Sequence, residues 1–261
     1  MLAVPVFMMR PTVLSEVGLR ENNEDAAFGS PRLVAVADGV GGAAAGEVAS
    51  SLVILKMIGL DKRRLVAPLE QELSAAVYDA NAVMAFATFY APRHAGMGTT
   101  LTVVALSNEG AYQVANVGDS RTYLFRDGRL RRLTRDDSFV QELIDRGALS
   151  EDEARRHPQR SVVLEALDGC ERPLAAVQTV RAQAGDRLLL CSDGMSDYLA
   201  DFEINELLTI RDPDVAVRRL INCALDHGSR DNITAIVADV IPGEDPREGW
   251  LEALPASADL G

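Results

Sequence analysis

Three apolar runs in this sequence each end on an aspartate, and these carboxylates are the residues best suited to chemistry. The runs LVAVAD, YQVANVGD and LLLCSD end at Asp38, Asp119 and Asp193, and a fourth aspartate, Asp231, directly precedes another apolar run. If the runs are neighbouring strands, their carboxylates repel by roughly 1–4 kcal/mol per pair at close range, so a cation must neutralise them. Oxygen ligands favour hard divalent ions, which indicates Mg2+ or Mn2+.

Aspartate followed by glycine is also ordinary turn chemistry, and for any one of these aspartates alone that interpretation stays open. Asp127-Gly128 is the internal comparison, because it lies among polar neighbours between two short runs and we assign it no function. The others differ by recurrence, since three strands that each deliver one carboxylate to one end are an unusual coincidence for turns. Glu24-Asp25 directly precedes a further short extended segment.

Arg20 is the candidate for binding an anion near this cluster. It lies four residues before Glu24 in GLRENNED, and its planar fork of donors can grip two oxygens of a phosphate. A surface arginine that pairs with a glutamate explains the same spacing, because such pairs are common and contribute little. The sequence does not choose between the two interpretations.

The composition limits the compartment and the partners. The chain has 39 acidic and 26 basic residues and a formal charge of −13, which argues against binding to nucleic acid or to an anionic membrane. Three widely spaced cysteines without a CxxC pair fit a reducing compartment, and the three histidines show no spacing typical of zinc. With neither a signal peptide nor a membrane span predicted, we expect a cytoplasmic protein, and a monomer.

Strands and helices alternate in a way that favours a mixed α+β architecture. Turn signals at residues 108–110 and 127–128 lie between strand-like runs, so they favour antiparallel hairpins and exclude a simple Rossmann sheet. The predicted strands are residues 33–37, 101–106, 112–117, 122–125, 187–191 and 233–241. The predicted helices are residues 43–58, 65–89, 139–146, 151–156, 203–208 and 215–227.

Two helices have clear start signals. Ser150 with Glu153 forms a capping box, and Asp212 places a capping side chain before Pro213 at a first helical position. Residues 134–169 are more charged than their surroundings and interrupt the strand series, which predicts a flap over the core. We expect a single domain over residues 1–241 and a loosely ordered tail at 242–261.

Six motifs together resemble the PPM (type 2C) family of metal-dependent protein serine/threonine phosphatases. They are GLRENNED, VADGVGG, MGTTLT, VGDSR, LLLCSDG and SRDNIT, and they extend in family order from about residue 14 to residue 240. Any one of them is weak, but their order makes an accidental match improbable. The resemblance is nearest to bacterial single-domain members that oppose Hanks-type kinases. It implies a four-layer α/β/β/α sandwich of two antiparallel sheets flanked by helices.

Carried over residue by residue, the resemblance implies a site for two Mn2+ or Mg2+ ions. Asp38, Asp193 and Asp231 would bind the first ion, while Asp38 and the Gly39 carbonyl would bind the second and Glu24 would reach it through water. These aspartates would be catalytic together with Arg20, which would hold the substrate phosphate. The remaining implied residues are Asp119, which with Asp193 would hold a third ion as in bacterial relatives, and the supporting Asp25, Thr99 and Thr100.

Two positions depart from the family pattern. Val40 stands where many eukaryotic members carry a histidine proposed as general acid, so the proton for the leaving group must come from elsewhere. Asp137 stands where bacterial members often have histidine, so flap and substrate preferences transfer less directly. No implied metal ligand is lost.

The implied activity is hydrolysis of phosphoserine and phosphothreonine in proteins by a metal-activated water, without a covalent intermediate. The implied partners are phosphorylated proteins, including a serine/threonine kinase or its substrates. One alternative is a binding or regulatory module that keeps the fold without catalysis, which the complete set of carboxylates disfavours. Another is a related phosphatase that acts on anti-sigma-factor antagonists, whose usual sensor domains we do not expect in a chain of 261 residues.

Overall fold

A computed structural model describes residues 7–40, 45–170 and 176–243 of the chain. Its strands are β1 (Phe7–Glu16), β2 (Asp25–Gly29), β3 (Leu33–Val40), β4 (Gly98–Thr99), β5 (Leu101–Leu106), β6 (Ala111–Val117), β7 (Arg121–Arg126), β8 (Arg129–Arg132), β9 (Gln178–Arg181), β10 (Arg187–Cys191) and β11 (Ile233–Pro242). Its helices are α1 (Ala45–Lys62), α2 (Leu69–Tyr90), α3 (Phe139–Asp145), α4 (Glu151–Ala154), α5 (Asp193–Ser196), α6 (Asp201–Leu208) and α7 (Pro213–Asp226), with a 3₁₀ turn at Pro92–His94.

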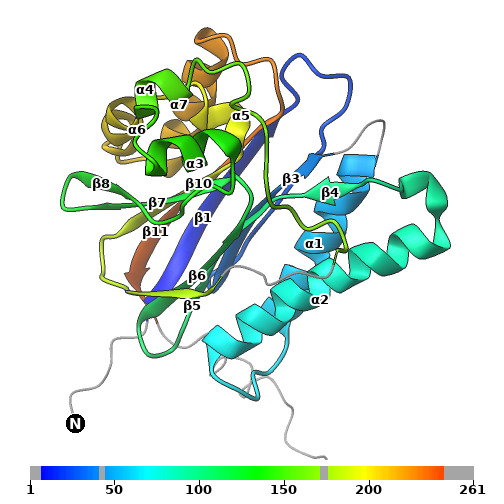
Figure 1. The fold of residues 1–261 in the computed structure, drawn as a ribbon. Coiled ribbons are helices and arrows are strands. Elements are labelled where there is room, and N and C mark those ends of the chain that lie inside the picture. Colours follow the sequence, from blue (N-terminus) through cyan, green and yellow to red (C-terminus); the bar gives the residue numbers. More distant parts are fainter. Residues whose placement is uncertain (1–6, 41–44, 171–175, 244–261) are drawn as a thin grey trace, which may run out of the picture.

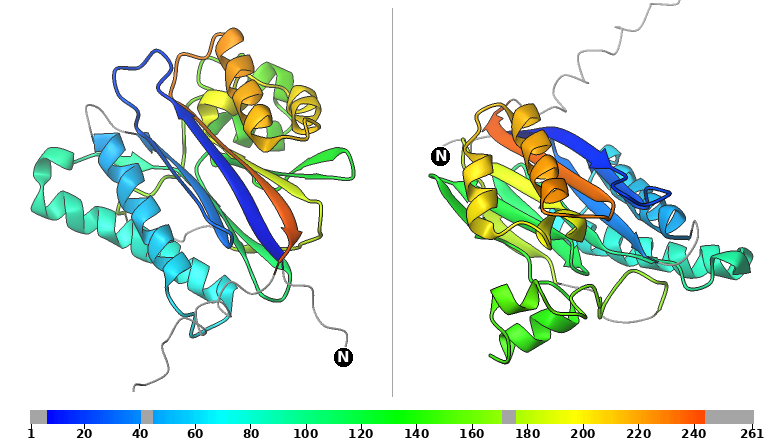
Figure 2. Two further views of the ribbon diagram at one scale, coloured as in Figure 1. Left: turned by 180° about the vertical axis from the view of Figure 1, so that it is seen from behind. Right: turned by 90° about the horizontal axis from the view of Figure 1, so that it is seen from above.

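Two antiparallel sheets lie face to face, and helices cover both outer faces (Figure 1). The first sheet has the strand order β1-β11-β10-β7-β8, and the second has the order β2-β3-β5-β6-β9 with β4 beside β3. Helices α1 and α2 pack on the second sheet, whereas α6 and α7 cover the first (Figure 2). The predicted four-layer sandwich is confirmed.

The central strands β3, β5 and β10 are largely apolar because each sheet is buried on both faces there. In β3, Leu33 and Ala35 pack toward the helices while Val34 and Val36 pack toward the other sheet. Strand β10 follows the same rule, with alternate residues facing the partner sheet and α7. Burial on both sides explains why these strands appear in the sequence as continuous hydrophobic runs rather than as alternating patterns.

Both predicted helix start signals are observed. The Ser150 hydroxyl accepts from the Glu153 N–H, and the Glu153 carboxylate accepts from the Ser150 N–H at 2.8 Å. Asp212 accepts from two backbone N–H groups of α7, and Pro213 occupies the first helical position. These caps satisfy backbone donors that have no partner inside the helix.

The start of α2 differs from the prediction, which began the helix at residue 65. The Glu72 carboxylate accepts from the N–H groups of Val66 and Ala67, both at 3.0 Å, and holds these residues in a loop. Pro68 follows with extended backbone and the helix begins at Leu69. Helix α1 continues to Lys62, four residues beyond its predicted end, while its predicted first residues, 43 and 44, lie outside the described residues.

Sequence patterns did not predict β1, β4 and β9, and they indicated β8 only as the short run after the turn at residues 127–128. Strands β1, β8 and β9 lie at sheet edges, and β4 is a two-residue pairing beside β3. An edge strand tolerates residues that a central strand does not, such as Pro11 in β1 and the arginines of β8. Pro11 in β1 and the arginines of β8 and β9 therefore hide these edge strands from a search for buried runs. The four-residue α5 was also not predicted.

The segment predicted as a flap, residues 134–169, carries α3 and α4 and is attached at both ends. Near its start, Asp136 accepts from Arg121 at 2.7 Å, and near its end Leu167 pairs with Thr99 through two backbone hydrogen bonds. The predicted tail lies outside the described residues from 244 onward, and Pro242 ends β11. Among the described helices, none is both long enough and apolar enough to cross a membrane.

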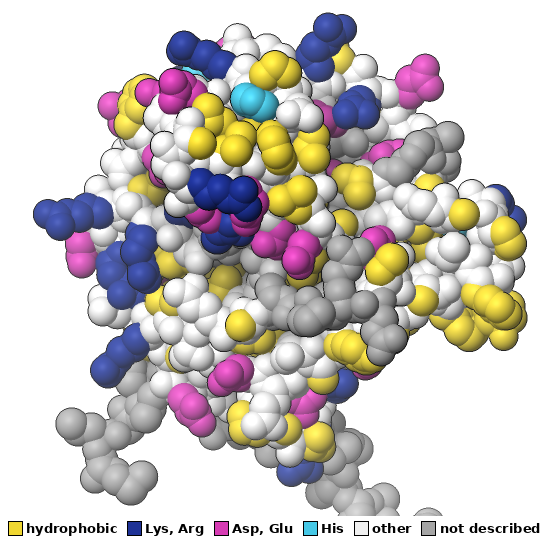
Figure 3. Space-filling model, in the orientation of Figure 1, with side chains coloured by type: hydrophobic (Ala, Val, Ile, Leu, Met, Phe, Trp, Pro, Cys, Tyr) yellow, Lys and Arg dark blue, Asp and Glu magenta, His cyan; other side chains and the backbone are white. Residues whose placement is uncertain are grey.

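An aromatic cluster marks the far end of α2, where Figure 3 shows hydrophobic side chains gathered on a projecting part of the surface. Phe86, Phe89 and Tyr90 are each more than 60% exposed. Their rings contact one another, with centroids 4.4 Å apart for Phe86–Tyr90 and 5.1 Å apart for Phe89–Tyr90. This cluster is remote from the sheets and takes no part in the core.

Candidate metal centre

The predicted carboxylates meet in one pocket at the end of the sandwich. The pocket has a volume of about 390 Å³ and is bordered by Val40 and by Ser161 and Val163 of the flap. Every residue that the resemblance placed at the ions or at the phosphate lines it, namely Arg20, Glu24, Asp38, Gly39, Asp119, Asp193 and Asp231.

Strand pairing explains why these residues meet. In the first sheet, Cys191 of β10 pairs with Arg121 of β7, so Asp193 and Asp119 both lie two residues beyond that pair. Strand β11 lies on the other side of β10, and Asp231 precedes its first residue by two. Asp38 comes from the second sheet, at the end of β3. The pocket is therefore the place where the ends of both sheets converge.

Thr99 and Thr100 fix the backbone on either side of Asp38. The Thr100 hydroxyl accepts from the Asp38 N–H at 3.0 Å, and the Thr99 hydroxyl donates to the Asp38 carbonyl at 2.8 Å. The Thr100 hydroxyl also bonds the Ser120 hydroxyl at 2.8 Å, next to Asp119. Both threonines lie behind the pocket and connect two of its carboxylate-bearing segments.

Asp25 lies opposite Asp38 in the β2–β3 pairing and does not line the pocket. Its carboxylate accepts from the Ser192 hydroxyl at 2.9 Å, directly beside Asp193. Burial is the main reason that the pKa of Asp25 is raised to about 6. Asp25 thus contributes a hydrogen bond to the segment that carries Asp193.

Several carboxylates lie close together in the buried part of the pocket. Burial, followed by the charges of neighbouring aspartates, raises the pKa of Asp38 and of Asp119 well above the usual range. The same two causes raise the pKa of Asp193 to about 6 and that of Asp197, at the end of α5, to about 7. A set of donors that are all oxygen and are this crowded fits hard divalent cations.

Arg20 supplies positive charge at the rim of the pocket. Its guanidinium donates to the Asp231 carboxylate at 2.7 Å, and its side chain is 58% exposed. The partner is an aspartate of the pocket and not the glutamate that the alternative interpretation assumed. An exposed guanidinium with a single carboxylate partner retains donors that can bind another anion.

Asn232, to which the sequence assigned no role, holds in place the loop of residues 17–24 at the entrance of the pocket (the entrance loop). Its side-chain oxygen accepts from the Glu24 N–H at 2.9 Å, and its amide donates to the carbonyls of Val17 and Asn22, both also at 2.9 Å. The SRDNIT motif contains this residue, but neither spacing nor hydrophobic pattern distinguishes it from an ordinary turn asparagine. Only its long-range partners identify its function.

Gly39 and Gly194, each directly after a pocket aspartate, are required by close packing. A Cβ on Gly39 would lie 2.3 Å from the Gly46 carbonyl oxygen, and one on Gly194 would lie 2.0 Å from the Asn232 carbonyl oxygen. Both distances are far below van der Waals contact, and neither glycine has a positive φ. The absence of a side chain lets these segments approach each other.

Asp137 connects the flap to the pocket wall. Its carboxylate accepts from the Gly118 N–H at 3.0 Å, and its own N–H donates to the Gly118 carbonyl at 2.9 Å. Gly118 directly precedes Asp119, so this residue supports the loop that carries a pocket carboxylate. Burial raises the pKa of Asp137.

Comparison with known proteins identifies the family of this chain. The family model described as Protein phosphatase 2C matches residues 20–237, which covers most of the chain and all seven of the pocket residues predicted above. The chain belongs to the protein phosphatase 2C family. This membership rests on the whole matched length and not on a single motif.

Several family members are similar over most of this chain. The serine/threonine protein phosphatase PstP of Mycobacterium tuberculosis is 45% identical over 236 residues, which are 90% of this chain but only 45% of that protein. The chain therefore spans less than half the length of this relative. The serine/threonine phosphatase stp of Listeria monocytogenes is 34% identical over 212 residues, covering 79% of this chain and 84% of the relative.

Solved structures of the family superpose closely on the fold. The crystal structure of M. tuberculosis PstP/Ppp has a TM-score of 0.85 at 45% identity and covers 89% of this chain and 98% of that one. The PstP catalytic domain in complex with two manganese ions has a TM-score of 0.84 at 42% identity, covering 90% of this chain and 99% of that one.

Proposed function

We propose that this chain is a metal-dependent protein serine/threonine phosphatase, which hydrolyses phosphoserine and phosphothreonine. The observation that carries the proposal is the convergence of Asp38, Asp119, Asp193 and Asp231 in one pocket beside Arg20. The names of the relatives and the two manganese ions bound by the PstP catalytic domain support it. The proposed catalytic unit is residues 1–241.

The proposed cofactors are two Mn2+ or Mg2+ ions. Asp38, Asp193 and Asp231 would hold the first ion, Asp38 and the Gly39 carbonyl would hold the second, and Glu24 would reach the second through water. When bound, such ions supply positive charge toward the phosphoryl oxygens and lower the pKa of the attacking water. Burial and then the crowding of the carboxylates raise the pKa of Asp38 and Asp193, which supports this assignment because a divalent ion offsets the crowded charges.

The protein residues then perform three further tasks. Arg20 turns from Asp231 to the substrate phosphate and orients it with two donors. Asp119 and Asp193 would hold a third ion. Thr99, Thr100 and Asp25 hold the carboxylate-bearing segments through the hydrogen bonds described above. Val40 has no proton to give, so it borders the pocket only as an apolar wall.

The proposed partners are phosphorylated proteins, including a serine/threonine kinase or its substrates. An open pocket at the surface, without a covering domain among the described residues, suits a phosphorylated side chain on a folded or extended protein. We propose that the chain acts as a cytoplasmic monomer, with no nucleic-acid or membrane partner, because its charge of −13 opposes binding to polyanions.

The experiment that tests this function measures phosphate release from a phosphothreonine peptide with and without Mn2+. The expected result is hydrolysis that requires the ion, disappears with a chelator and returns when Mn2+ or Mg2+ is restored. Absence of hydrolysis with either ion, despite Mn2+ binding measured by calorimetry, would favour the alternative of a non-catalytic binding module. A phosphotyrosine peptide is the control for substrate class.

A further inference from the structure

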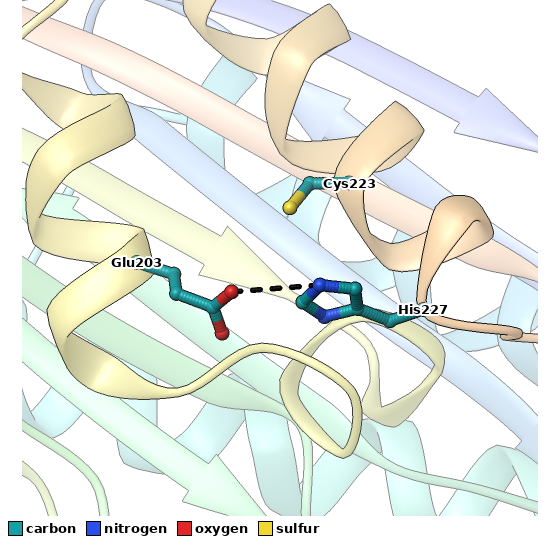
Figure 4. Close-up of side chains that lie close together, drawn as sticks. All are labelled: Glu203, Cys223 and His227. Atoms are coloured by element: carbon teal, nitrogen blue, oxygen red, sulfur yellow. Dashed lines mark ion pairs between the residues drawn. The ribbon is translucent and has the colours of Figure 1, made fainter.

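A second group of possible ligands lies between α6 and the end of α7, away from the carboxylate pocket. Glu203 comes from α6, and Cys223 and His227 come from the last turn of α7 and the residue that follows it. The ligand atoms of the three side chains all lie within 4.8 Å of one another. Figure 4 shows them directed into the same space between the two helices.

Hydrogen bonds from neighbouring backbone orient two of these side chains. His227 Nδ1 lies 3.0 Å from the Tyr198 carbonyl oxygen, which can only accept, so Nδ1 carries the proton. Glu203 Oε2 accepts from the Ala200 N–H at 2.9 Å. The other atoms, His227 Nε2 and Glu203 Oε1, then face each other at 3.5 Å.

This arrangement places two electron-rich atoms opposite each other. In the neutral imidazole, Nε2 presents a lone pair toward a carboxylate oxygen, which is repulsive unless a proton or a cation lies between them. A Glu203–His227 ion pair with a protonated ring would relieve the repulsion without involving Cys223. The thiol within the same group favours a cation instead, since it adds a third ligand.

The chemistry of the three donors suggests which cation. Sulfur, nitrogen and one carboxylate oxygen suit Zn2+, whereas the oxygen-only pocket suits Mg2+ or Mn2+. Tetrahedral zinc with ordinary bond lengths places its ligand atoms about 3.3–3.8 Å apart, and the Glu203–His227 distance of 3.5 Å lies in that range. His227 is exposed and the other two are half-buried, which leaves an entry path and a fourth position for water.

The local charge also favours a cation. The carboxylates of Glu203 and Asp226 both lie near the Cys223 thiol. A divalent ion would offset these two carboxylates and stabilise the thiolate that zinc binding requires. The backbone carbonyl behind His227 is the kind of outer partner that metal-bound histidines usually have.

We propose that Glu203, Cys223 and His227 form a zinc site that joins α6 to the end of α7. Histidine spacing in the sequence did not predict a zinc site. Glu203 lies 24 residues before His227, and only the packing of the two helices brings them together. Tyr198, which orients His227, follows α5, and His227 itself lies four residues before Asp231. Zinc there would restrain two segments next to the carboxylate pocket without contacting substrate.

Cobalt substitution tests the proposal directly. Co2+ is added to the metal-free full chain, and the near-ultraviolet band of a thiolate-to-cobalt transition is followed, because oxygen ligands alone do not produce it. The expected result is a band whose final intensity corresponds to one thiolate-bound ion per chain and which Zn2+ displaces. The D193N variant, altered only in the carboxylate pocket, should keep the band, which separates the two sites.

Two thiol variants provide the matched comparison. C223S should lose the band, whereas C170S, which removes an exposed thiol outside the group, should retain it. H227Q and E203Q should each weaken cobalt binding by roughly 10-fold or more. Zn2+ should raise the melting temperature of the native chain more than that of C223S. No band in the native chain, or an unchanged band in C223S, would overturn the proposal.

Discussion

The same dipeptide, Asp-Gly, serves two purposes in two regions of this molecule. At Asp127-Gly128, between β7 and β8, both residues have positive φ values of 52° and 76°, as a tight hairpin turn requires. At Asp193-Gly194, φ is not positive and the glycine lies where a Cβ would meet the Asn232 carbonyl oxygen at 2.0 Å. Gly128 is required for its backbone conformation, whereas Gly194 is required because there is no space for a side chain.

The aspartates differ in the same way. Asp127 is exposed at the tip of a hairpin. Asp193 is in a pocket where burial and neighbouring carboxylates raise its pKa to about 6. A turn needs only local geometry, whereas a metal-binding carboxylate needs other charges brought in from distant segments. Substitutions in the two regions should therefore separate the two roles.

The largest effect is expected from D193N, compared with D127N. Removing one charge from the pocket should lower kcat/KM for a phosphothreonine peptide by roughly 1,000-fold, since a bound cation contributes several kcal/mol to the transition state. D127N should leave kcat/KM unchanged. Steady-state kinetics with saturating Mn2+ measures both, and near-native activity of D193N would contradict the ligand assignment.

Alanine substitutions of Gly194 and Gly128 test, through protein stability, whether the two glycines meet different requirements. G194A must move the Asn232 backbone, so it should lower the free energy of unfolding by about 3 kcal/mol, the upper end for overpacking, and also reduce activity. G128A meets no atom within 4 Å and should cost only about 1 kcal/mol for its left-handed backbone, with activity retained. Urea unfolding monitored by circular dichroism gives the two values. Equal losses in the two variants would remove the distinction.

The pocket should also make the stability of the metal-free protein depend on pH. The folded pKa of Asp193, about 6, exceeds that of an unfolded aspartate, so the folded state binds more protons and becomes less stable as pH rises. Between about pH 4 and pH 7 the loss from this group is at most about 3 kcal/mol. Melting curves in chelator should show the decline, and Mn2+ or the D193N substitution should reduce it. A flat profile in chelator would argue against the crowded carboxylates.

The smallest effect is expected where Asn232 holds the entrance loop. N232A removes the three hydrogen bonds that keep Glu24 and the neighbouring Arg20 segment in place, so kcat/KM should fall by roughly 10-fold. Asn205 is the matched control, because it accepts one hydrogen bond from Leu130 beside the β7–β8 hairpin. N205A should leave kcat/KM unchanged. Parallel loss of activity in both variants would indicate a general effect on folding.

Much of the fold was predictable because its central strands are buried on both faces. Strands β5 and β10 were predicted with their observed limits, and both antiparallel hairpins followed from turn residues. The edge strands β1 and β9 were not predicted, because one exposed edge permits proline and charged residues. The start of α2 was predicted too early, because the Glu72 carboxylate accepts hydrogen bonds from the Val66 and Ala67 N–H groups and holds these residues in a loop.

The sequence by itself determined which residues carry the proposed chemistry and where they stand on their own strands. An apolar run that ends in Asp38 or Asp193 is a local signal, since strand length and turn formation depend on a few adjacent residues. Only the tertiary structure decided that these aspartates share a pocket, that Asn232 supports it, and that Glu203 meets Cys223 and His227. Such encounters depend on sheet register and helix packing between residues far apart in the chain, which no local pattern encodes.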